Sequence, residues 1–289
     1  MGFSIVSNAP GRQGVTMLVV RPHPDDESSA TGGMLAYYRA RGVRTGVVMC
    51  TGGEEGQMLD PDLDSGVDGP RLREIREREL HAACAILGVT ELRMLGYRDS
   101  GMQDTPANRH PDAFAQADPV EAAGRLVRII RELRPAIMVT EPPGGGYPHP
   151  DHIACHRVSL DAFHAAGDDR AYPEAGPSWQ VPKLYAIAQI DDGQWEALRP
   201  ELKAAGFDMG SRRRRARGAG AATATVALDV RPYSEIQRRA LLAHRTQIPP
   251  DSFWARLPAD LYRRASATAY FIRLHPPALP GEHEQDLFD

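Results

Sequence analysis

Short apolar runs alternate with longer amphipathic stretches along the first half of the chain. The runs resemble buried strands, most of them rich in β-branched residues, and they cover residues 16–20, 43–50, 91–95 and 136–140. Between them, apolar residues recur at helical spacing over residues 28–41, 70–87 and 119–133. This alternation predicts an α/β fold with a mostly parallel, doubly wound sheet and helices on both faces.

The last third of the chain is less regular. A helix is predicted at 232–244, and strands are predicted at 183–190, 222–230 and 268–274. No linker separates this part, so we expect residues 1–289 to form a single domain with a smaller C-terminal strand and helix region. Residues 276–289 are predicted to be a loose tail.

The composition is that of an ordinary soluble globular chain, long enough for one large α/β domain. It has 289 residues, a formal charge of −4 and 42% hydrophobic residues. No apolar run is long enough to span a membrane, and the N-terminus lacks a basic start and an apolar signal core. Three cysteines without a CxxC pair fit a reducing compartment. We therefore expect a cytoplasmic protein without a membrane partner, and homo-oligomerisation is left open.

One basic run departs from this balance. Arg212–Arg217 contains five arginines in glycine-rich sequence, without interleaved aromatic residues. With a negative overall charge, this pattern favours a solvated loop over a nucleic-acid surface. A flap that touches an anionic substituent of a substrate is the alternative reading of this run.

Two clusters of histidine and aspartate follow predicted strands. His23-Pro24-Asp25-Asp26-Glu27 comes directly after the strand at 16–20, and His149-Pro150-Asp151-His152 comes shortly after the strand at 136–140. The carboxyl ends of parallel strands meet at one edge of a sheet, where ligands of doubly wound folds bind. The two clusters are therefore predicted to converge on one site.

The donor types in the two clusters suit a catalytic metal ion. His23 and Asp26 can point at one ion, and His152 could supply a third ligand. Two histidines and one carboxylate with an open position suit catalytic Zn²⁺, and the same set suits non-haem Fe²⁺. A metal-bound hydroxide would then be available at neutral pH.

The remaining polar residues of the clusters suit proton transfer. Asp25 is the candidate general base. His149 is expected to act as general acid or electrostatic stabiliser, held by Asp151, and Tyr147 to donate to an oxyanion. Asp25 and Asp151 also precede helix-like segments, so both could serve as helix N-caps, a role compatible with catalysis.

Three classes of function fit these clusters. The first is a metal-dependent hydrolase, the second a two-His, one-carboxylate iron oxygenase, and the third a non-catalytic sugar-binding protein. The oxygenase is disfavoured because such triads normally lie on a β-sandwich, whereas this sequence alternates strand with helix. The binding protein is disfavoured because Asp25, Tyr147 and His149 are present together with the ligands.

The sequence resembles the LmbE/PIG-L family of zinc-dependent N-acetylglucosaminyl deacetylases. The resemblance rests on Pro-His-Pro-Asp-Asp-Glu-Ser-Ser at 22–29 and Gly-Gly-Tyr-Pro-His-Pro-Asp-His at 145–152. Further matches cover 50–54, 76–89, 99–101 and 243–247, so the resemblance extends over about residues 16–250. It is strongest to the branch of the mycothiol conjugate amidase and the mycothiol deacetylase. The family's fold, a Rossmann-like α/β sheet, agrees with the fold predicted above.

The resemblance implies a role for each matching residue. His23, Asp26 and His152 would bind zinc, and Asp25 would be the general base. His149 would protonate or stabilise the tetrahedral intermediate, Asp151 would tune His149, and Tyr147 would polarise the amide carbonyl. Substrate contacts are implied for Glu54, Gln57, Arg76 and Asp99.

The implied reaction removes an acyl group from an N-acyl glucosaminide by attack of metal-bound hydroxide. The partner would be a small-molecule glycoconjugate of the GlcNAc-inositol, GlcNAc-malate or thiol-glycoside type. Deacetylation of a glycosylated natural-product precursor is the alternative within the hydrolase class. Ala30 and Gln57 depart from the nearest branches near the expected substrate pocket, so the acyl group and the aglycone are left open.

Overall fold

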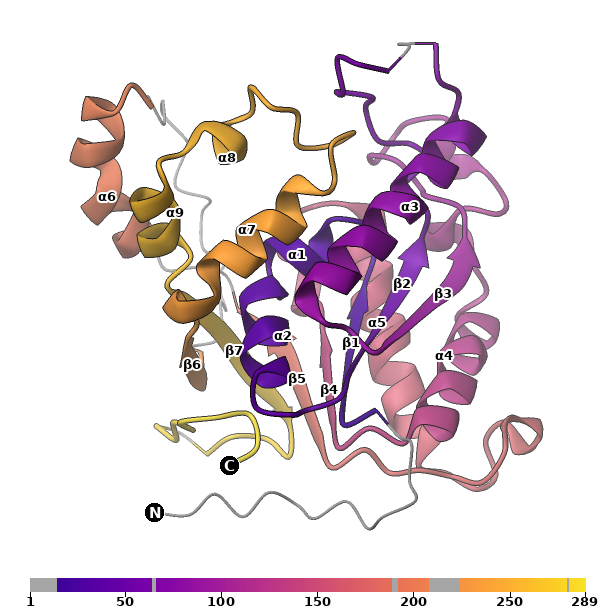
Figure 1. The fold of residues 1–289 in the computed structure, drawn as a ribbon. Helices are drawn as coiled ribbons and strands as arrows, with labels where there is room; N and C mark the ends of the chain where they lie inside the picture. Colours follow the sequence, from indigo (N-terminus) through magenta and orange to yellow (C-terminus); the bar gives the residue numbers. More distant parts are fainter. Residues whose placement is uncertain (1–14, 64–65, 189–191, 208–223, 280) are drawn as a thin grey trace.

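A sheet of mixed direction forms the centre of the part of the chain that the structure describes (Figure 1). The computed structural model describes residues 15–63, 66–188, 192–207, 224–279 and 281–289. Within these ranges the sheet has the strand order β3-β2-β1-β4-β5-β7-β6. The strands are β1 Met17–Arg21, β2 Thr45–Thr51, β3 Glu91–Tyr97, β4 Ile137–Thr140, β5 Lys183–Ile187, β6 Val226–Asp229 and β7 Thr268–His275. The first five are parallel, whereas β7 is antiparallel to β5 and β6 to β7. The predicted mostly parallel, doubly wound sheet is confirmed.

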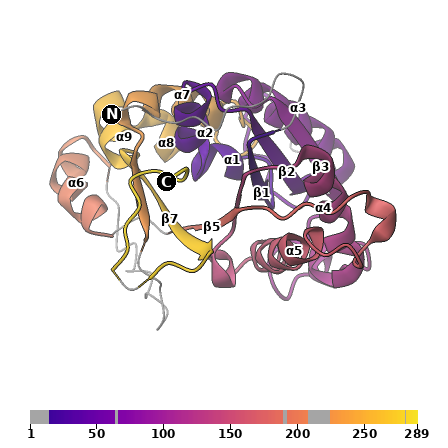
Figure 2. The ribbon, with the colours of Figure 1, turned by 90° about the horizontal axis from the view of Figure 1, so that it is seen from below.

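Helices cover both faces of the sheet (Figure 2). They are α1 Asp26–Ser29, α2 Gly32–Arg39, α3 Gly69–Leu87, α4 Pro119–Leu133, α5 Pro150–Ala166, α6 Asp192–Ala204, α7 Ser234–Leu242, α8 Phe253–Arg256 and α9 Ala259–Ala265. Short 3₁₀ helices lie at Ala107–Arg109, Phe114–Gln116, Pro143–Gly145, Pro173–Ala175 and Arg231–Tyr233. Helices α4 and α5 pack on one face, and α2, α3 and α7 pack on the other.

Alternate residues of each central strand feed these two cores. Leu18 and Val20 of β1 pack with α4 and α5, whereas Met17 and Val19 pack with α2, α3 and α7. All four side chains are buried, because a parallel strand covered on both faces has no solvent side. This explains why the strand appears in the sequence as a continuous apolar run.

Two long helices match their predictions because strong local signals mark where they begin. Asp68 accepts the amide of Arg71 at 3.0 Å at the start of α3, and Gly88, with a φ of 73°, ends that helix. Asp118 accepts the amide of Glu121 at 2.9 Å at the start of α4. The predicted helices at 70–87 and 119–133 are thus confirmed.

The predicted helix at 28–41 is divided into α1 and α2. The chain leaves helical hydrogen bonding around Ala30 and Thr31, and the Thr31 hydroxyl donates to the Glu27 carbonyl at 2.8 Å. A Cβ on Gly33 would lie 2.9 Å from a methyl of Val230, so glycine at this position lets α2 approach the segment before α7. Packing against the C-terminal region therefore redirects this segment.

The C-terminal third contains three helices that the sequence did not predict. Helices α6, α8 and α9 surround a separate small core. Its buried members are Leu198, Leu202, Leu241, Leu257, Leu261, Tyr262 and Ala265. These helices are short and bury their apolar residues against one another, so their periodic signal was weak. The strand predicted at 183–190 ends at Ile187, and the one predicted at 222–230 covers Val226–Asp229.

The prediction of a loose tail at 276–289 is wrong for its last residues. Leu287 is fully buried in the core beneath α2. Asp286 accepts hydrogen bonds from the hydroxyls of Tyr37 and Tyr38 at 3.0 and 2.8 Å. Glu284 forms ion pairs with Lys183 and Arg273. These contacts lie far apart in sequence, which is why composition alone suggested a tail.

The basic run Arg212–Arg217 lies outside the described residues. Among the residues that the structure does describe, no helix is both long and apolar enough to cross a membrane.

Candidate metal centre and active site

The loops after β1, β2, β3 and β4 lie at the carboxyl edge of the sheet. Strand β1 pairs with β2 on one side and with β4 on the other, so the strand order reverses at β1. Such a reversal separates neighbouring loops and opens a crevice where ligands bind. The two histidine and aspartate clusters meet at this point, where His23 contacts Asp151, 128 positions further along the chain.

His23, Asp26 and His152 form a compact set of donor atoms. Oδ2 of Asp26 lies 3.5 Å from Nδ1 of His23 and 3.6 Å from Nε2 of His152. All three donor atoms are within 4.8 Å of one another. Two ligands about 2.1 Å from one tetrahedral ion are separated by roughly 3.4 Å. The separations are therefore too long for good hydrogen bonds and suit ligands of a common cation.

A carboxylate stands behind each histidine of this set. Nε2 of His23 lies 3.0 Å from Oδ2 of Asp151, and Nδ1 of His152 lies 3.3 Å from Oε2 of Glu141. Nδ1 of His152 is buried and has no hydrogen bond. Carboxylates in this position fix the ring orientation of metal-binding histidines and raise their basicity. The arrangement fits a metal ion on the inner nitrogen of each ring.

Arg21 lies between two carboxylates of the site, those of Asp26 and Glu141. Its guanidinium lies 3.2 Å from Oδ1 of Asp26 and 2.5 Å from Oε1 of Glu141. Burial favours the neutral acid of Asp26, but the nearby charges of His152 and Arg21 hold the pKa of this carboxyl well below its usual range. Asp26 is therefore an ionised carboxylate across the neutral pH range.

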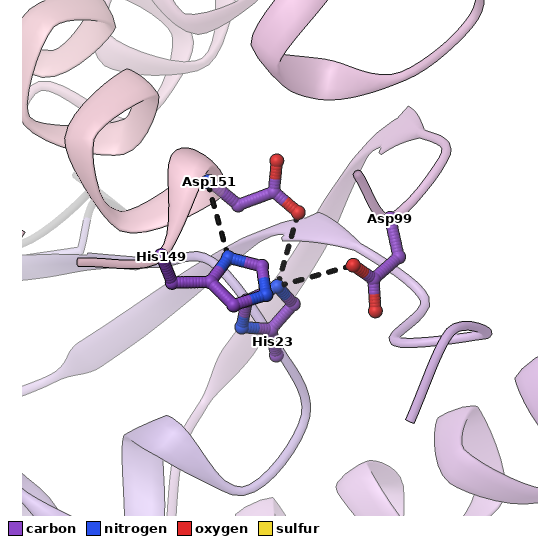
Figure 3. Close-up of side chains that lie close together, drawn as sticks. All are labelled: His23, Asp99, His149 and Asp151. Carbon is purple, nitrogen blue, oxygen red and sulfur yellow. Dashed lines mark hydrogen bonds and ion pairs between the residues drawn. The ribbon is translucent and has the colours of Figure 1, made fainter. Parts of the chain in front are cut away.

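A second group of donors shares His23 and contains Asp99, His149 and Asp151 (Figure 3). The carboxylate of Asp151 already accepts the amide of Ser100 at 2.9 Å, the hydroxyl of Ser100 and the His23 ring. Asp99 accepts the amide of Gly101 at 2.8 Å. These contacts are ordinary hydrogen bonds. We therefore interpret this group as residues that orient His23, and not as a second metal site.

Asp25 lies beside the metal set and is clamped by Arg76. Its Oδ2 lies 3.0 Å from Nη2 of Arg76, and its side chain is 25% exposed. Burial raises the pKa of Asp25 to about 6, opposed by the charge of Arg76 and assisted by that of Asp26. Asp25 occupies the N-cap position of α1, but its side chain makes no capping hydrogen bond. The carboxylate is thus available for proton transfer.

Arg76 is hydrogen-bonded to the loops that follow β1 and β2. It donates to the carbonyl of Gly53 at 2.7 Å and to that of Pro24, in addition to its contact with Asp25. A Cβ on Gly53 would lie 2.4 Å from Nη1 of Arg76, and the φ of Gly53 is 72°. Glycine at 53 therefore lets the guanidinium reach the site. The substrate contact that the resemblance implied for Arg76 stays a prediction.

His149 is held by a backbone amide. Its Nδ1 accepts the N–H of Asp151 at 3.2 Å and thereby caps α5 (Figure 3). In the neutral form, the ring proton therefore lies on Nε2. Burial and the charge of His23 lower the pKa of His149 to about 4, although Asp151 opposes this. The predicted partnership of Asp151 with His149 thus runs through the Asp151 amide, while the Asp151 carboxylate holds His23.

Tyr147 is partly buried and lies beside His149 and His152. Its ring centroid lies 4.8 Å from that of His152 and 5.8 Å from that of His149. Burial raises the pKa of Tyr147, so its hydroxyl remains a protonated donor. This position is compatible with the predicted contact to a substrate oxygen.

The other predicted substrate residues are placed differently. Asp99 lies within the site, with Oδ1 3.6 Å from Nε2 of His23. Glu54 lines a neighbouring cavity of 610 Å³ next to Arg73. The Gln57 side chain is exposed, and its carbonyl accepts a hydrogen bond from Gln247. Of these three, Asp99 alone contacts the histidine cluster.

Sequence reasoning missed Arg21, Ser100 and Glu141 as parts of the site. Arg21 and Glu141 are charged residues at the ends of apolar strands, and both are buried. A charge directly after a buried strand was a usable signal, because such residues are seldom buried without a partner. Ser100 lies in the segment 99–101 that resembles the family, but the sequence suggested no role for its side chain.

The fold and the site define a Rossmann-like α/β protein with a two-His, one-carboxylate centre beside a candidate general base. Residues 18–163 match the protein family PIG-L, described as GlcNAc-PI de-N-acetylase. The chain belongs to this PIG-L/LmbE family. It is accordingly an amide-hydrolysing enzyme of the deacetylase type.

Named relatives support this assignment over nearly the full length. The chain is 40% identical to the 1D-myo-inositol 2-acetamido-2-deoxy-alpha-D-glucopyranoside deacetylase of Acidothermus cellulolyticus, covering 94% of each chain. It is 42% identical to the enzyme of the same name from Nocardiopsis dassonvillei, covering 94% of this chain and 99% of that one. Among solved structures, the N,N'-diacetylchitobiose deacetylase from Pyrococcus horikoshii aligns with a TM-score of 0.61 at 18% identity, covering 91% and 84% of the two chains. At that identity the likeness concerns the fold.

Proposed function

We propose that this enzyme removes the acetyl group from an N-acetylglucosaminide linked to inositol. The observation that carries the proposal is the meeting of His23, Asp26 and His152 with Asp25 at one strand edge. The inositol aglycone is inferred from the printed names of relatives that are 40% and 42% identical over 94% of this chain. Hydrolysis of the amide bond of a thiol glycoside is the alternative reaction at the same centre. A cytoplasmic location and a homo-oligomer remain predictions.

His23, Asp26 and His152 would hold a single Zn²⁺. The fit rests on the separations of their donor atoms and on the carboxylates of Asp151 and Glu141 behind the two rings. When bound, such a metal would lower the pKa of its water to about 7 and polarise the amide carbonyl. The same donors suit Fe²⁺, and the family assignment favours hydrolysis over oxygenase chemistry with either metal.

Asp25 would act as the general base. With a pKa of about 6 it is mostly ionised at pH 7, yet it is basic enough to remove a proton from water. A group with this pKa can also return the proton to the departing amine. Arg76 would hold the carboxylate in place through its 3.0 Å contact.

His149 would act as a neutral hydrogen-bond donor. A pKa of about 4 leaves its ring uncharged at neutral pH, and the Asp151 amide occupies Nδ1. Its Nε2–H would therefore stabilise the oxygen that becomes negative during attack on the carbonyl. Of the two roles left open by the sequence, the stabilising role is favoured. Tyr147, which lies beside His149 and His152, would donate to the same oxygen.

A product screen tests this function. Zinc-loaded enzyme is incubated with N-acetylglucosaminyl-inositol, N-acetylglucosaminyl-malate and an S-conjugated thiol glycoside, and products are identified by mass spectrometry. We expect free acetate, with the inositol glycoside as the best substrate by kcat/KM. Release of an S-substituted N-acetylcysteine with no acetate from the inositol glycoside would contradict the proposed substrate.

Variants of Asp25 test the mechanism independently of the substrate. Asp25→Asn should lower kcat by about 10²–10⁴ while the metal content stays at one per chain. Asp260→Asn is the control, because this carboxylate is an exposed residue of α9 that lies near Arg264. Unchanged hydrolysis in Asp25→Asn would eliminate Asp25 as the base.

A further inference from the structure

Asp25 has a backbone conformation that residues with side chains seldom adopt. Its φ is 112° and its ψ is −27°, and such angles persist only where surrounding contacts hold them. The N–H of Asp25 donates to Oε2 of Glu27 at 2.9 Å. Its carbonyl accepts the amides of Ser28 and Ser29 at 3.1 and 2.9 Å. The direction of the Asp25 carboxylate thus depends on how Glu27 is held.

Glu27 is held by a histidine from the opposite end of the chain. Its Oε1 lies 2.7 Å from Nε2 of His244, which is 217 positions away, and both side chains are 0% exposed. A carboxylate removed from water needs a partner for each oxygen. Oε1 of Glu27 faces His244 and also accepts the Ser28 hydroxyl at 2.5 Å, and Oε2 accepts the Asp25 amide. Because one carboxylate makes the contacts to both His244 and Asp25, it links their positions.

Helix α7 holds the same turn at a second point. Nε2 of Gln237 donates to the carbonyls of Ser28 and Ser29 at 3.2 and 3.0 Å. His244 follows the end of α7, which lies against α1 in the fold (Figure 1). The C-terminal region is therefore built against the catalytic turn.

We propose that the buried Glu27–His244 pair is a positioning device for the general base. It holds Asp25 in its left-handed conformation and thereby aims the carboxylate at the attacking water. Glu27 and His244 are positioning residues, since neither is placed to touch the substrate. This inference rests on the proposed role of Asp25. It gives the C-terminal region a function in catalysis, although His244 belongs to neither of the two histidine and aspartate clusters.

Two amide substitutions at one position provide the test. His244→Gln can place its Nε2 near the original ring Nε2, whereas His244→Asn is too short to reach Glu27. Displacing a catalytic group by about 1 Å costs up to about a hundredfold in rate. We expect His244→Asn to lower kcat at least tenfold with KM within twofold and the metal content unchanged. His244→Gln should stay within threefold of the parent.

Thr246→Val is the matched control for the stability of this segment. The Thr246 hydroxyl is fully buried and donates to Glu79 of α3 at 2.6 Å, so its loss loosens the same loop without touching Glu27. We expect a lower Tm in Thr246→Val with kcat within twofold. A kcat loss in Thr246→Val equal to that in His244→Asn would overturn the inference.

A double-mutant cycle separates this inference from the proposed function. In an Asp25→Asn background, His244→Asn should change kcat less than threefold, because the aimed carboxylate is already absent. The same tenfold loss in that background, or a loss accompanied by loss of metal, would overturn the positioning role. Failure of both His244 variants to fold would also overturn it, because the pair would then hold the fold. An Asp25→Asn variant with full activity would instead overturn the proposed function.

Discussion

Nδ1 of His152 faces Oε2 of Glu141 at 3.3 Å, on the side of the ring away from Asp26. The contact places a buried carboxylate behind a candidate metal ligand, and Arg21 neutralises its other oxygen. Residues that contact the outer nitrogen of a metal-binding histidine commonly set the metal affinity by orienting the ring.

Glu141→Gln should weaken metal binding by about 10–100-fold, because the negative charge that Glu141 places beside the His152 ring is lost. Competition with a chelator of known affinity measures the change, and metal content is determined on the same samples. Glu132→Gln is the control, since Glu132 is an exposed residue of α4 paired with Arg93. Equal affinity in Glu141→Gln and the parent would show that the contact does not tune the metal.

Arg76→Met should move the acid limb of the pH profile to higher pH. The base must be ionised, and its pKa of about 6 places half-loss of kcat/KM near pH 6 in the parent. Arg76 stabilises the carboxylate, so removing it makes Asp25 harder to ionise and raises the pKa by about one to three units. The profile of kcat/KM between pH 5 and 9 measures this.

Arg73→Met serves as the control for this pH shift. Arg73 lies on the same helix and pairs with Glu54 and Glu77, away from Asp25. Its acid limb should coincide with that of the parent. A limb that does not move in Arg76→Met would mean that another group controls it.

His149→Gln should retain more activity than His149→Ala. A neutral donor is sufficient if the ring acts uncharged, as its pKa of about 4 indicates. We expect kcat to fall less than about tenfold in His149→Gln and by about 10²–10³ in His149→Ala, the usual effect of removing an oxyanion donor. Steady-state kinetics at pH 7.5 distinguishes the two, with the exposed His164→Ala as control. Equal losses in both variants would favour a protonated imidazole as acid.

Leu287→Ala should lower the free energy of unfolding by about 2–5 kcal/mol, because the side chain is fully buried. Leu279→Ala is the control in the same C-terminal segment, where the side chain is 72% exposed and the expected change is below about 0.5 kcal/mol. Urea unfolding followed by circular dichroism gives both values. Equal stability of Leu287→Ala and the parent would indicate that the C-terminal segment does not dock in solution.

The sequence predicted the central architecture because its signals are local. Apolar runs of strand length, helical repeats and caps such as Asp68 and Asp118 act over a few residues, so they can be recognised without a structure. The short helices α6, α8 and α9 were not recognised, because each buries few residues and depends on its neighbours. The tail was misjudged for a related reason, since Leu287 has no regular element around it.

The sequence by itself determined the donor types and placed them after strands that would end together. His23, Asp26 and His152 could be selected from their chemistry and from the strand before each cluster, and the structure brings these three together. Which nitrogen of a ring faces which partner was decided only by tertiary structure. The Asp151 carboxylate contacts His23 across 128 positions, Glu141 lies behind His152 across 11, and His244 contacts Glu27 across 217. All three contacts depend on rotamers and on helix packing. Such contacts are set by how whole elements pack, and no periodicity or motif along the chain encodes them.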